Sequence, residues 1–321
     1  MKDLINNNNC IKVIRGLALI AVAIFICGST TVTMAQAQQL FAKPEDAVKA
    51  LKNAVKAKNN DALIAMFGPR SHEFVSGDIV KDANDFQDFA DSIAESTKLE
   101  KDGDQKVILL VGNDDWPFAA PIVKVADQWR FDTDAGIEEI INRRIGANEI
   151  DAAYICQAYA IAQFEYFNND DWDGDQVSEY AQKISSSPGQ KDGLYWTKSS
   201  DDEEDSPLGE LFAYATAEGY KAQKGTVKSA APFHGYNFKV LFRQGPSAPG
   251  GKFDYIINGN MIAGFALVAY PATWGNSGVM TFLINQEGRV YEKNLGPRTS
   301  TIAGAMTEYD PDGSWSLTDL E

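Results

Sequence analysis

The chain contains only two histidines, His72 and His234, and imidazole is the side chain that most readily exchanges protons near neutral pH. His234 is the stronger candidate for a general base because it lies in a Phe-His-Gly-Tyr sequence, just before a predicted strand. A hydrolase would use it with a neighbouring acid such as Asp254, whereas a structural histidine that orients Tyr236 explains the same residues. His72 is expected in an exposed loop.

The acidic stretch 169–175 is a candidate calcium loop, because oxygen-bearing side chains alternate along it and a glycine is sixth. The twelfth position, which normally supplies a bidentate carboxylate, is Tyr180, and Glu179 comes one residue early. Acidic Asp-Gly stretches also form simple turns. The sequence therefore leaves open a calcium site or a solvated turn, and a calcium site would use Asp171, Asp173 and Asp175. No other cofactor is expected.

A third group combines aromatic rings with a carboxylate. Asp192, Tyr195 and Trp196 are close in sequence, and Tyr236 belongs to the histidine motif. Amphipathic rings beside a carboxylate suit sugars, peptides or cations. The same residues suit packing between domains, so the group predicts either a ligand-binding platform or an interior contact.

Composition excludes several classes of protein. The chain of 321 residues has a formal net charge of −16, so nucleic acids and anionic membrane surfaces are unexpected partners. The Gly-x-Ser-x-Gly, His-Glu-x-x-His and Cys-x-x-Cys patterns do not occur, and the glycine-rich stretch 245–251 lacks a phosphate-loop lysine. We therefore expect a protein that binds a small ligand or a protein partner and is not an enzyme.

Residues 1–37 have the pattern of a cleavable secretory signal peptide. Three basic residues precede the apolar stretch 16–27, which is too short to span a bilayer, and Ala35-Gln-Ala37 fits a cleavage site. Cleavage would leave 26 basic against 44 acidic residues, a net charge of −18, with Cys156 as the one remaining cysteine. We expect a periplasmic or secreted protein without a stable membrane anchor after cleavage.

The remaining chain alternates between two periodicities that predict an α+β fold. Helices are expected from Pro44, from Asn60 to Phe67 and around Phe89. Strands are expected at 106–111, 118–125 and 128–132, which completes an N-terminal helix-plus-antiparallel-sheet domain, 38–145.

A long helical stretch from Asp134, with a pause at Gly146, is expected to lie on an antiparallel meander in a second domain, 146–321. Tyr236, Phe238, Val240 and Phe242 alternate, so their side chains should share one face of a strand. The turns Asn258-Gly259 and 285–288 predict two hairpins, which join strands at 253–257, 261–270, 279–284 and 289–293.

Several motifs resemble a bacterial exported family known as domain of unknown function 2950. They are Pro-Phe-His-Gly-Tyr at 232–236, the Gly- and Pro-rich stretch 244–251, Gly-Phe-Ala-Leu-Val-Ala-Tyr-Pro at 264–271, Gly-Val-Met-Thr-Phe at 278–282, and Lys-Asp-Gly-Leu-Tyr-Trp at 191–196. The resemblance covers most of the chain after the leader. It implies export and an α+β fold, and it implies no particular reaction.

Two further resemblances concern single domains. The helix at 148–167 followed by the meander is similar to the globular part of type IV pilin-like proteins, although the hydrophobic stem of pilins is absent before Asn148. The order of elements in the first half is similar to the cone-shaped fold of the nuclear-transport-factor and ketosteroid-isomerase superfamily. A pilus- or secretion-associated subunit is therefore an alternative to the binding protein and to the hydrolase.

Overall fold

The computed structural model describes residues 38–169, 176–198, 200, 202–218 and 232–319. They form two compact units that divide between Arg144 and Ile145. Both units combine helices with antiparallel strands, which confirms the predicted α+β class. The predicted leader and the predicted calcium ligands Asp171, Asp173 and Asp175 lie outside the described residues.

The N-terminal unit begins with helices whose first turns are stabilised by side-chain caps. The Asn59 side chain accepts the N–H of Ala62, and the Asp78 side chain accepts two N–H groups at the start of the next long helix. The sequence had predicted all three α-helices. The helical elements are α3 (Pro44–Lys56), α4 (Asn60–Phe67), the short 3-10 helix η1 (Pro69–Phe74), which includes the exposed His72, and α5 (Ile79–Glu95).

The antiparallel sheet of the N-terminal unit has the order β1-β2-β4-β5, and β3 pairs with β2. Its strands are β1 (Thr97–Lys101), β2 (Lys106–Val111), β3 (Trp116–Pro117), β4 (Ile122–Val125) and β5 (Gln128–Phe131). The prediction of one strand over 118–125 was wrong at its start, because Pro121 has no N–H for a ladder bond. Ala120 instead packs under Gly136, where an added Cβ would lie 2.7 Å from the Ala120 Cβ.

Aromatic side chains fill the core of the N-terminal unit. Phe67 and Phe74 are fully buried and meet edge to face, with ring centroids 5.2 Å apart. Phe89 from α5 stacks on Phe118 at 5.2 Å. Such pairs add about 0.5–1.5 kcal/mol to the burial of their apolar area. Phenylalanines on the inward faces of the helices and of the sheet therefore do most to hold the two together.

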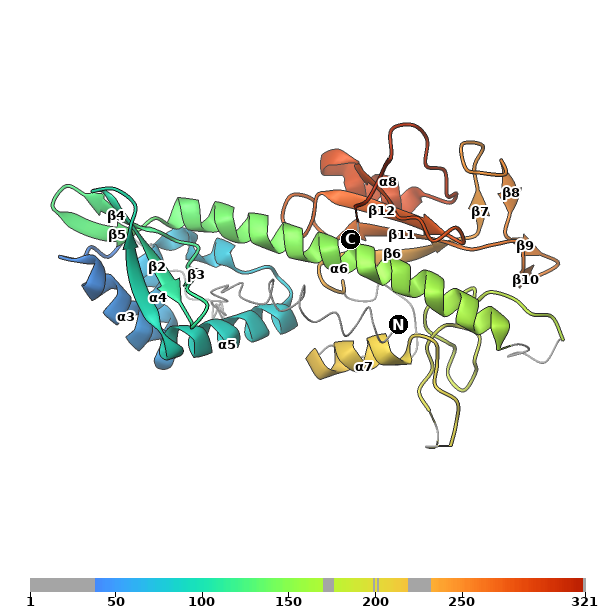
Figure 1. The fold of residues 1–321 in the computed structure, drawn as a ribbon, viewed down its shortest axis with the longest axis horizontal. Coiled ribbons are helices and arrows are strands. Elements are labelled where there is room, and N and C mark those ends of the chain that lie inside the picture. Colours follow the sequence, from blue (N-terminus) through green and yellow to red (C-terminus); the bar gives the residue numbers. More distant parts are fainter. Residues whose placement is uncertain (1–37, 170–175, 199, 201, 219–231, 320–321) are drawn as a thin grey trace, which may run out of the picture. The chain divides into compact units, whose positions relative to one another are not determined.

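Helix α6 (Thr133–Asn168) is continuous through Gly146, so the predicted pause is wrong. A glycine inside a helix costs only about 1 kcal/mol relative to alanine, which tertiary packing outweighs here. Beyond Ile145, the face of α6 that enters the core carries small side chains, including Ala153 and Cys156. These let the helix approach the C-terminal sheet closely, and Figure 1 shows this part of α6 lying across β6, β11 and β12.

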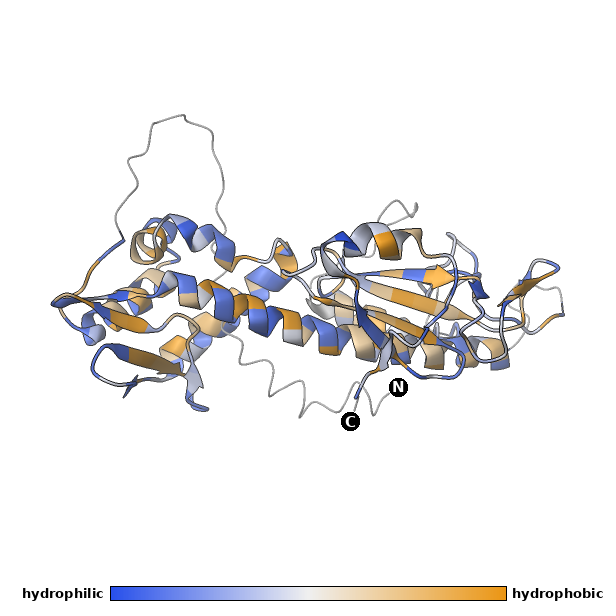
Figure 2. Cartoon of the chain, turned by 90° about the horizontal axis from the view of Figure 1, so that it is seen from above, coloured by the Kyte–Doolittle hydropathy of each residue, from blue (hydrophilic) through white to orange (hydrophobic). Residues whose placement is uncertain are grey.

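The C-terminal sheet is a five-stranded antiparallel meander with the order β14-β13-β12-β11-β6. Its strands are β6 (Tyr236–Leu241), β11 (Ala266–Pro271), β12 (Met280–Asn285), β13 (Tyr291–Asn294) and β14 (Ser316–Leu317). Hydrophobic residues dominate its central strands (Figure 2). The expected alternation in the first strand fails at Phe242, which lies beyond the end of β6 and is 40% exposed, because the chain enters the next hairpin there.

Two small hairpins are inserted between β6 and β11. The first joins β7 (Arg243–Gln244) to β8 (Phe253–Asp254), and the second joins β9 (Ile256–Ile257) to β10 (Asn260–Met261) through the predicted Asn258-Gly259 turn. The C-terminal unit also contains α7 (Gly209–Glu218), η2 (Gly296–Arg298) and α8 (Thr299–Ala305). The Lys239 ammonium donates to the Gly304 and Met306 carbonyls, which holds the end of α8 against β6.

Candidate functional site

His234 lies at the first central position of a two-residue turn that leads into β6. Phe233 and Tyr236 exchange two backbone hydrogen bonds of 2.9 and 3.0 Å across it. Both central residues have positive φ, 47° for His234 and 73° for Gly235, which is the conformation of a type I′ turn. A histidine in this conformation is uncommon, so its side chain is expected to have a specific partner.

That partner is Asp151 on α6. Its Oδ2 lies 2.5 Å from His234 Nδ1, and only 11% of the histidine side chain is exposed. A carboxylate at Nδ1 fixes the orientation of an imidazole, and in acid–base enzymes the same arrangement leaves the other ring nitrogen for proton transfer. The rings of Phe233 and Tyr214 lie 4.3 and 6.5 Å from the imidazole centroid. The histidine is therefore both paired with a carboxylate and enclosed by aromatic rings.

Two further polar residues of α6 hold the loop that precedes β12. The buried Asn148 donates to the Ser277 carbonyl at 2.9 Å. Glu149 accepts the backbone N–H groups of Val279 and Met280 at 2.8 and 2.9 Å. One turn of α6 thus uses an amide and two carboxylates to fix both the histidine turn and the start of β12.

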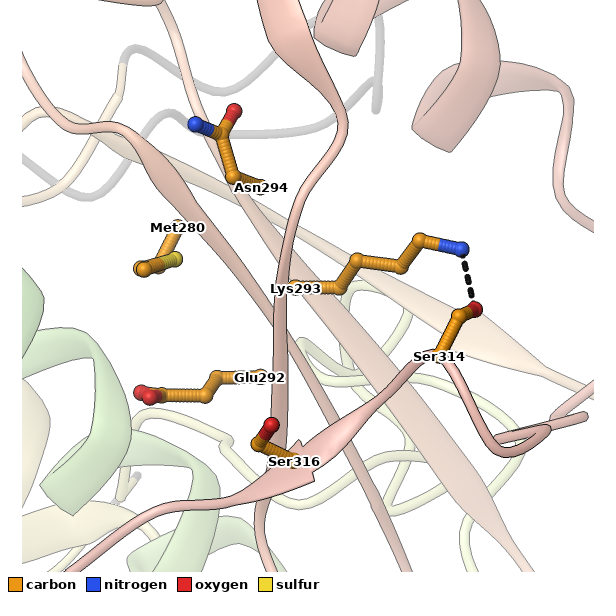
Figure 3. Close-up of a pocket in the computed structure, with 6 residues that line it drawn as sticks. All are labelled: Met280, Glu292, Lys293, Asn294, Ser314 and Ser316. Carbon is orange, nitrogen blue, oxygen red and sulfur yellow. Dashed lines mark hydrogen bonds between the residues drawn. The ribbon is translucent and has the colours of Figure 1, made fainter.

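A polar hollow opens on the same sheet where β13 and β14 separate. The two strands pair at Tyr291 with Leu317 and at Glu292 with Ser316, and the pairing ends there. The hollow has a volume of about 240 Å³ and is lined by Met280, Glu292, Lys293, Asn294, Ser314 and Ser316, a set called the β13 hollow below (Figure 3). Burial raises the pKa of Glu292, and the carboxylates of Glu149 and Asp319 raise it further.

The N-terminal unit contains a buried cluster of acids around an arginine. Arg144 is 1% exposed and donates to the Phe74 carbonyl at 2.8 Å. Asp82 accepts the Ser76 N–H at 2.9 Å. Asp85 lies 3.5 Å from the Lys81 ammonium with 13% of its side chain exposed, and burial raises its pKa to about 6 despite that ammonium.

A family model described as Protein of unknown function (DUF2950) matches residues 38–318. The chain belongs to this family. The resemblance seen in the sequence motifs is therefore confirmed over nearly all of the described residues. No curated protein and no solved structure is significantly similar to the chain.

The DUF2950 chain does not bring the predicted pair His234 and Asp254 together. Asp254 lies on β8, where its carboxylate is 3.5 Å from Arg243, a residue that follows the far end of β6. His234 precedes the near end of β6, and a six-residue strand is roughly 20 Å long. Asp151, 83 residues before the histidine, takes the place expected for Asp254.

The four residues of the predicted ligand platform have structural contacts. Burial opposes ionisation of Asp192, but bonds from Lys183 and Ser187 outweigh it and lower its pKa. Tyr195 stacks on Phe212 with ring centroids 3.8 Å apart, and Trp196 is only 6% exposed. Tyr236 is fully buried and donates to the Met280 carbonyl at 2.8 Å, and burial together with Glu149 raises its pKa.

Metal and membrane sites can be assessed only for the described residues. Among these, no group of three or more His, Cys, Asp or Glu side chains is arranged to hold a metal ion. Glu179, the carboxylate beside the predicted calcium stretch, accepts the Met261 N–H at 2.8 Å. No helix within the described part of the chain is long and apolar enough to cross a membrane.

Proposed function

We propose that this DUF2950 protein is exported to the periplasm or secreted, and that it binds a small ligand or a partner without catalysing a reaction. The apolar stretch 16–27 and the Ala-Gln-Ala sequence at 35–37 support export. The observation that carries the binding role is the β13 hollow, where polar side chains from two strands and a loop line one open space of about 240 Å³.

The Cys156 and Tyr236 side chains of the C-terminal unit support binding over catalysis because both are buried. The Cys156 thiol is fully buried, and burial raises its pKa, which disfavours the thiolate that a nucleophile needs. The Tyr236 hydroxyl donates to a backbone carbonyl inside the core.

A thermal-shift screen of the purified protein against a library of periplasmic metabolites tests this proposal. A ligand at 100 times its dissociation constant stabilises the folded state by about 2.7 kcal/mol, so true ligands should raise the melting temperature clearly. The shift should be reduced in a Glu292→Gln variant, which keeps the shape of the β13 hollow. A library without any stabilising compound, together with no captured protein partner, would contradict a binding role.

The alternative is a periplasmic hydrolase, and the His234–Asp151 pair is the observation that favours it. Nδ1 at 2.5 Å from a carboxylate is the arrangement that orients a catalytic imidazole. A hydrolase would lose turnover in His234→Gln and in Asp151→Asn, and would keep it in Asp254→Asn. A screen of ester, amide, phosphate and glycoside substrates that detects no turnover removes this alternative.

A role as a pilus- or secretion-associated subunit is supported by the order of elements in the C-terminal unit. A helix followed by an antiparallel meander is the arrangement that prompted the comparison with pilin-like domains. A subunit of this kind should co-sediment with filaments from the producing cell. A protein found only in the monomeric soluble fraction would argue against it.

A further inference from the structure

The shape of the β13 hollow follows from the end of the β13–β14 ladder. Continuing the register past the Glu292–Ser316 pair would place Asn294 beside Ser314, but no strand pairing occurs there. Lys293 spans this gap, since its ammonium donates to the Ser314 hydroxyl at 2.6 Å. This bond links the two segments beyond the end of their ladder, where polar side chains of both line the hollow.

The β13 hollow offers one donor and one acceptor whose roles can be assigned. The Asn294 Oδ1 accepts the Trp274 indole N–H at 3.0 Å and the Gly296 N–H at 2.8 Å, which leaves its amide nitrogen as a donor. Within the described part of the chain, the Glu292 carboxylate accepts no hydrogen bond and acts only as an acceptor. Figure 3 shows the Asn294 nitrogen, Met280 and the Glu292 carboxylate on the same side of β13.

Charge argues against an anionic ligand. An anion would meet Glu292, with Glu149 and Asp319 near enough to raise the pKa of that carboxyl. Lys293 also lines the hollow, but its ammonium extends from the other side of β13 to Ser314 (Figure 3). A neutral ligand with several hydrogen-bonding groups can bond the carboxylate, amide and hydroxyl groups of the lining without the repulsion that an anion would meet.

An indole ring bonds one of the lining residues. Trp274 is half-buried, and its N–H donates to the Asn294 side chain, which lines the hollow. Met280 supplies a small apolar contact in the lining. Sugars combine hydroxyls that both donate and accept with apolar C–H faces that pack on aromatic rings, so they match a carboxylate, an amide donor, serine hydroxyls and an indole.

We propose that the β13 hollow binds a neutral carbohydrate, either a monosaccharide or one sugar unit of a glycan. This assignment rests on the proposed binding function and names the chemical class of its ligand. Adjacent hydroxyls of one sugar ring donate to Glu292 and accept from the Asn294 amide nitrogen, while Ser316 bonds a third hydroxyl. The volume of about 240 Å³ gives room for roughly one sugar ring.

Titration of the purified protein with neutral hexoses and N-acetylated hexosamines, followed by saturation-transfer NMR and tryptophan fluorescence, tests the assignment. We expect saturable binding of at least one sugar, weakened tenfold or more in Glu292→Gln and in Asn294→Ala. Ser316→Ala should weaken it less. Glu287→Gln, an exposed carboxylate on the turn before β13, is the matched control and should bind as the unchanged protein does.

The possible outcomes distinguish a failure of the carbohydrate assignment from a failure of the proposed binding function. A sugar that binds equally well to the Glu292→Gln and Asn294→Ala variants overturns the assignment of the hollow. If no sugar binds, but a library compound of another class does and loses affinity in Glu292→Gln, the carbohydrate assignment fails and the binding function stands. If neither sugars nor any other compound or partner binds, both proposals fail.

Discussion

His234 Nδ1 and Asp151 Oδ2 lie 2.5 Å apart and join a strained turn to the middle of a helix. The residues are 83 positions apart in sequence, and both belong to the C-terminal unit. Next to this pair, Asn148 and Glu149 attach the loop before β12 to the same turn of α6. The stretch 148–151 therefore acts as a single anchoring point for the beginning of two strands.

Breaking the His234–Asp151 pair should destabilise the protein. We expect His234→Gln and Asp151→Asn each to lower the free energy of unfolding by about 1–3 kcal/mol, because a charge-assisted hydrogen bond is lost. The double variant should lose less than the two single losses added together, since both remove one interaction. Urea unfolding measures all three. A His234→Gln variant of unchanged stability that abolishes a hydrolytic activity would instead favour the hydrolase.

Crowding at Gly235 should make this position intolerant of alanine. An added Cβ would lie 2.5 Å from Asn148 Nδ2 and 2.9 Å from the Ser277 Cβ. Gly275 is the matched control, because its φ of 76° is close to the 73° of Gly235 and nothing lies within 4 Å of its Cβ position. We expect Gly235→Ala to cost about 1–3 kcal/mol more than Gly275→Ala in urea unfolding. Equal losses would show that only backbone strain matters.

The raised pKa of Asp85, about 6, predicts a stability that depends on pH. A carboxyl whose pKa is higher in the folded state than its ordinary value near 3.8 stabilises the fold while protonated. That contribution is complete below about pH 4 and is lost as the pH rises through about 6. Asp85→Asn should therefore stabilise the protein by about 1–3 kcal/mol at pH 8 and change little at pH 4.

Asp91→Asn is the control for this effect, because Asp91 is exposed on the same helix α5. The free energy of unfolding of the Asp91→Asn variant should stay close to that of the unchanged protein from pH 4 to pH 8. Chemical denaturation at four or five pH values gives both curves. A constant difference between Asp85→Asn and the unchanged protein at every pH would mean that Asp85 does not titrate in this window.

Cys156 should be unreactive in the folded protein. It is fully buried on α6, and burial raises the pKa of its thiol, so neither access nor thiolate is available. We expect no reaction with Ellman's reagent under native conditions and one thiol per chain in denaturant after leader removal. Rapid labelling of the native protein would indicate that α6 separates readily from the sheet.

The calcium site at Asp171, Asp173 and Asp175 stays a prediction from the sequence. Calcium should raise the melting temperature of the purified protein if these residues bind it, because a ligand selective for the folded state stabilises that state. Replacing all three by asparagine should remove the increase. The absence of any shift at millimolar calcium would leave the stretch as a solvated turn.

Local signals predicted the parts of the fold that depend on a few neighbouring residues. Asn258-Gly259 specified a two-residue hairpin because both residues accept positive φ, at 54° and 100°. Strand β1 was missed because its Thr-Lys-Leu-Glu-Lys sequence is polar, as is common for an edge strand. The sequence analysis placed Phe242 in the same strand as β6, one residue too far, because an alternating pattern does not show where the partner strand ends.

The candidate site could be predicted only in part, because its partners are distant in sequence. The Phe-His-Gly-Tyr motif identified His234, but nothing local to it points to Asp151. A signal was available in the helix itself, where the polar residues Asn148, Glu149 and Asp151 come just before the small apolar residues Ala152 and Ala153 that enter the core. Glu292 gave no such signal, because its importance comes from the separation of β13 and β14.

The insertion of two hairpins between β6 and β11 has a consequence for how the sheet assembles. Leu241 pairs with Ala266, so a connection of two dozen residues must close before these strands meet. Hairpins form in about 1–10 microseconds, and each halving of a flexible loop saves about 0.6 kcal/mol of closure entropy. The β7–β8 and β9–β10 hairpins shorten that loop in advance. The two hairpins lie outside the five-stranded sheet, and yet their residues should influence how fast that sheet folds.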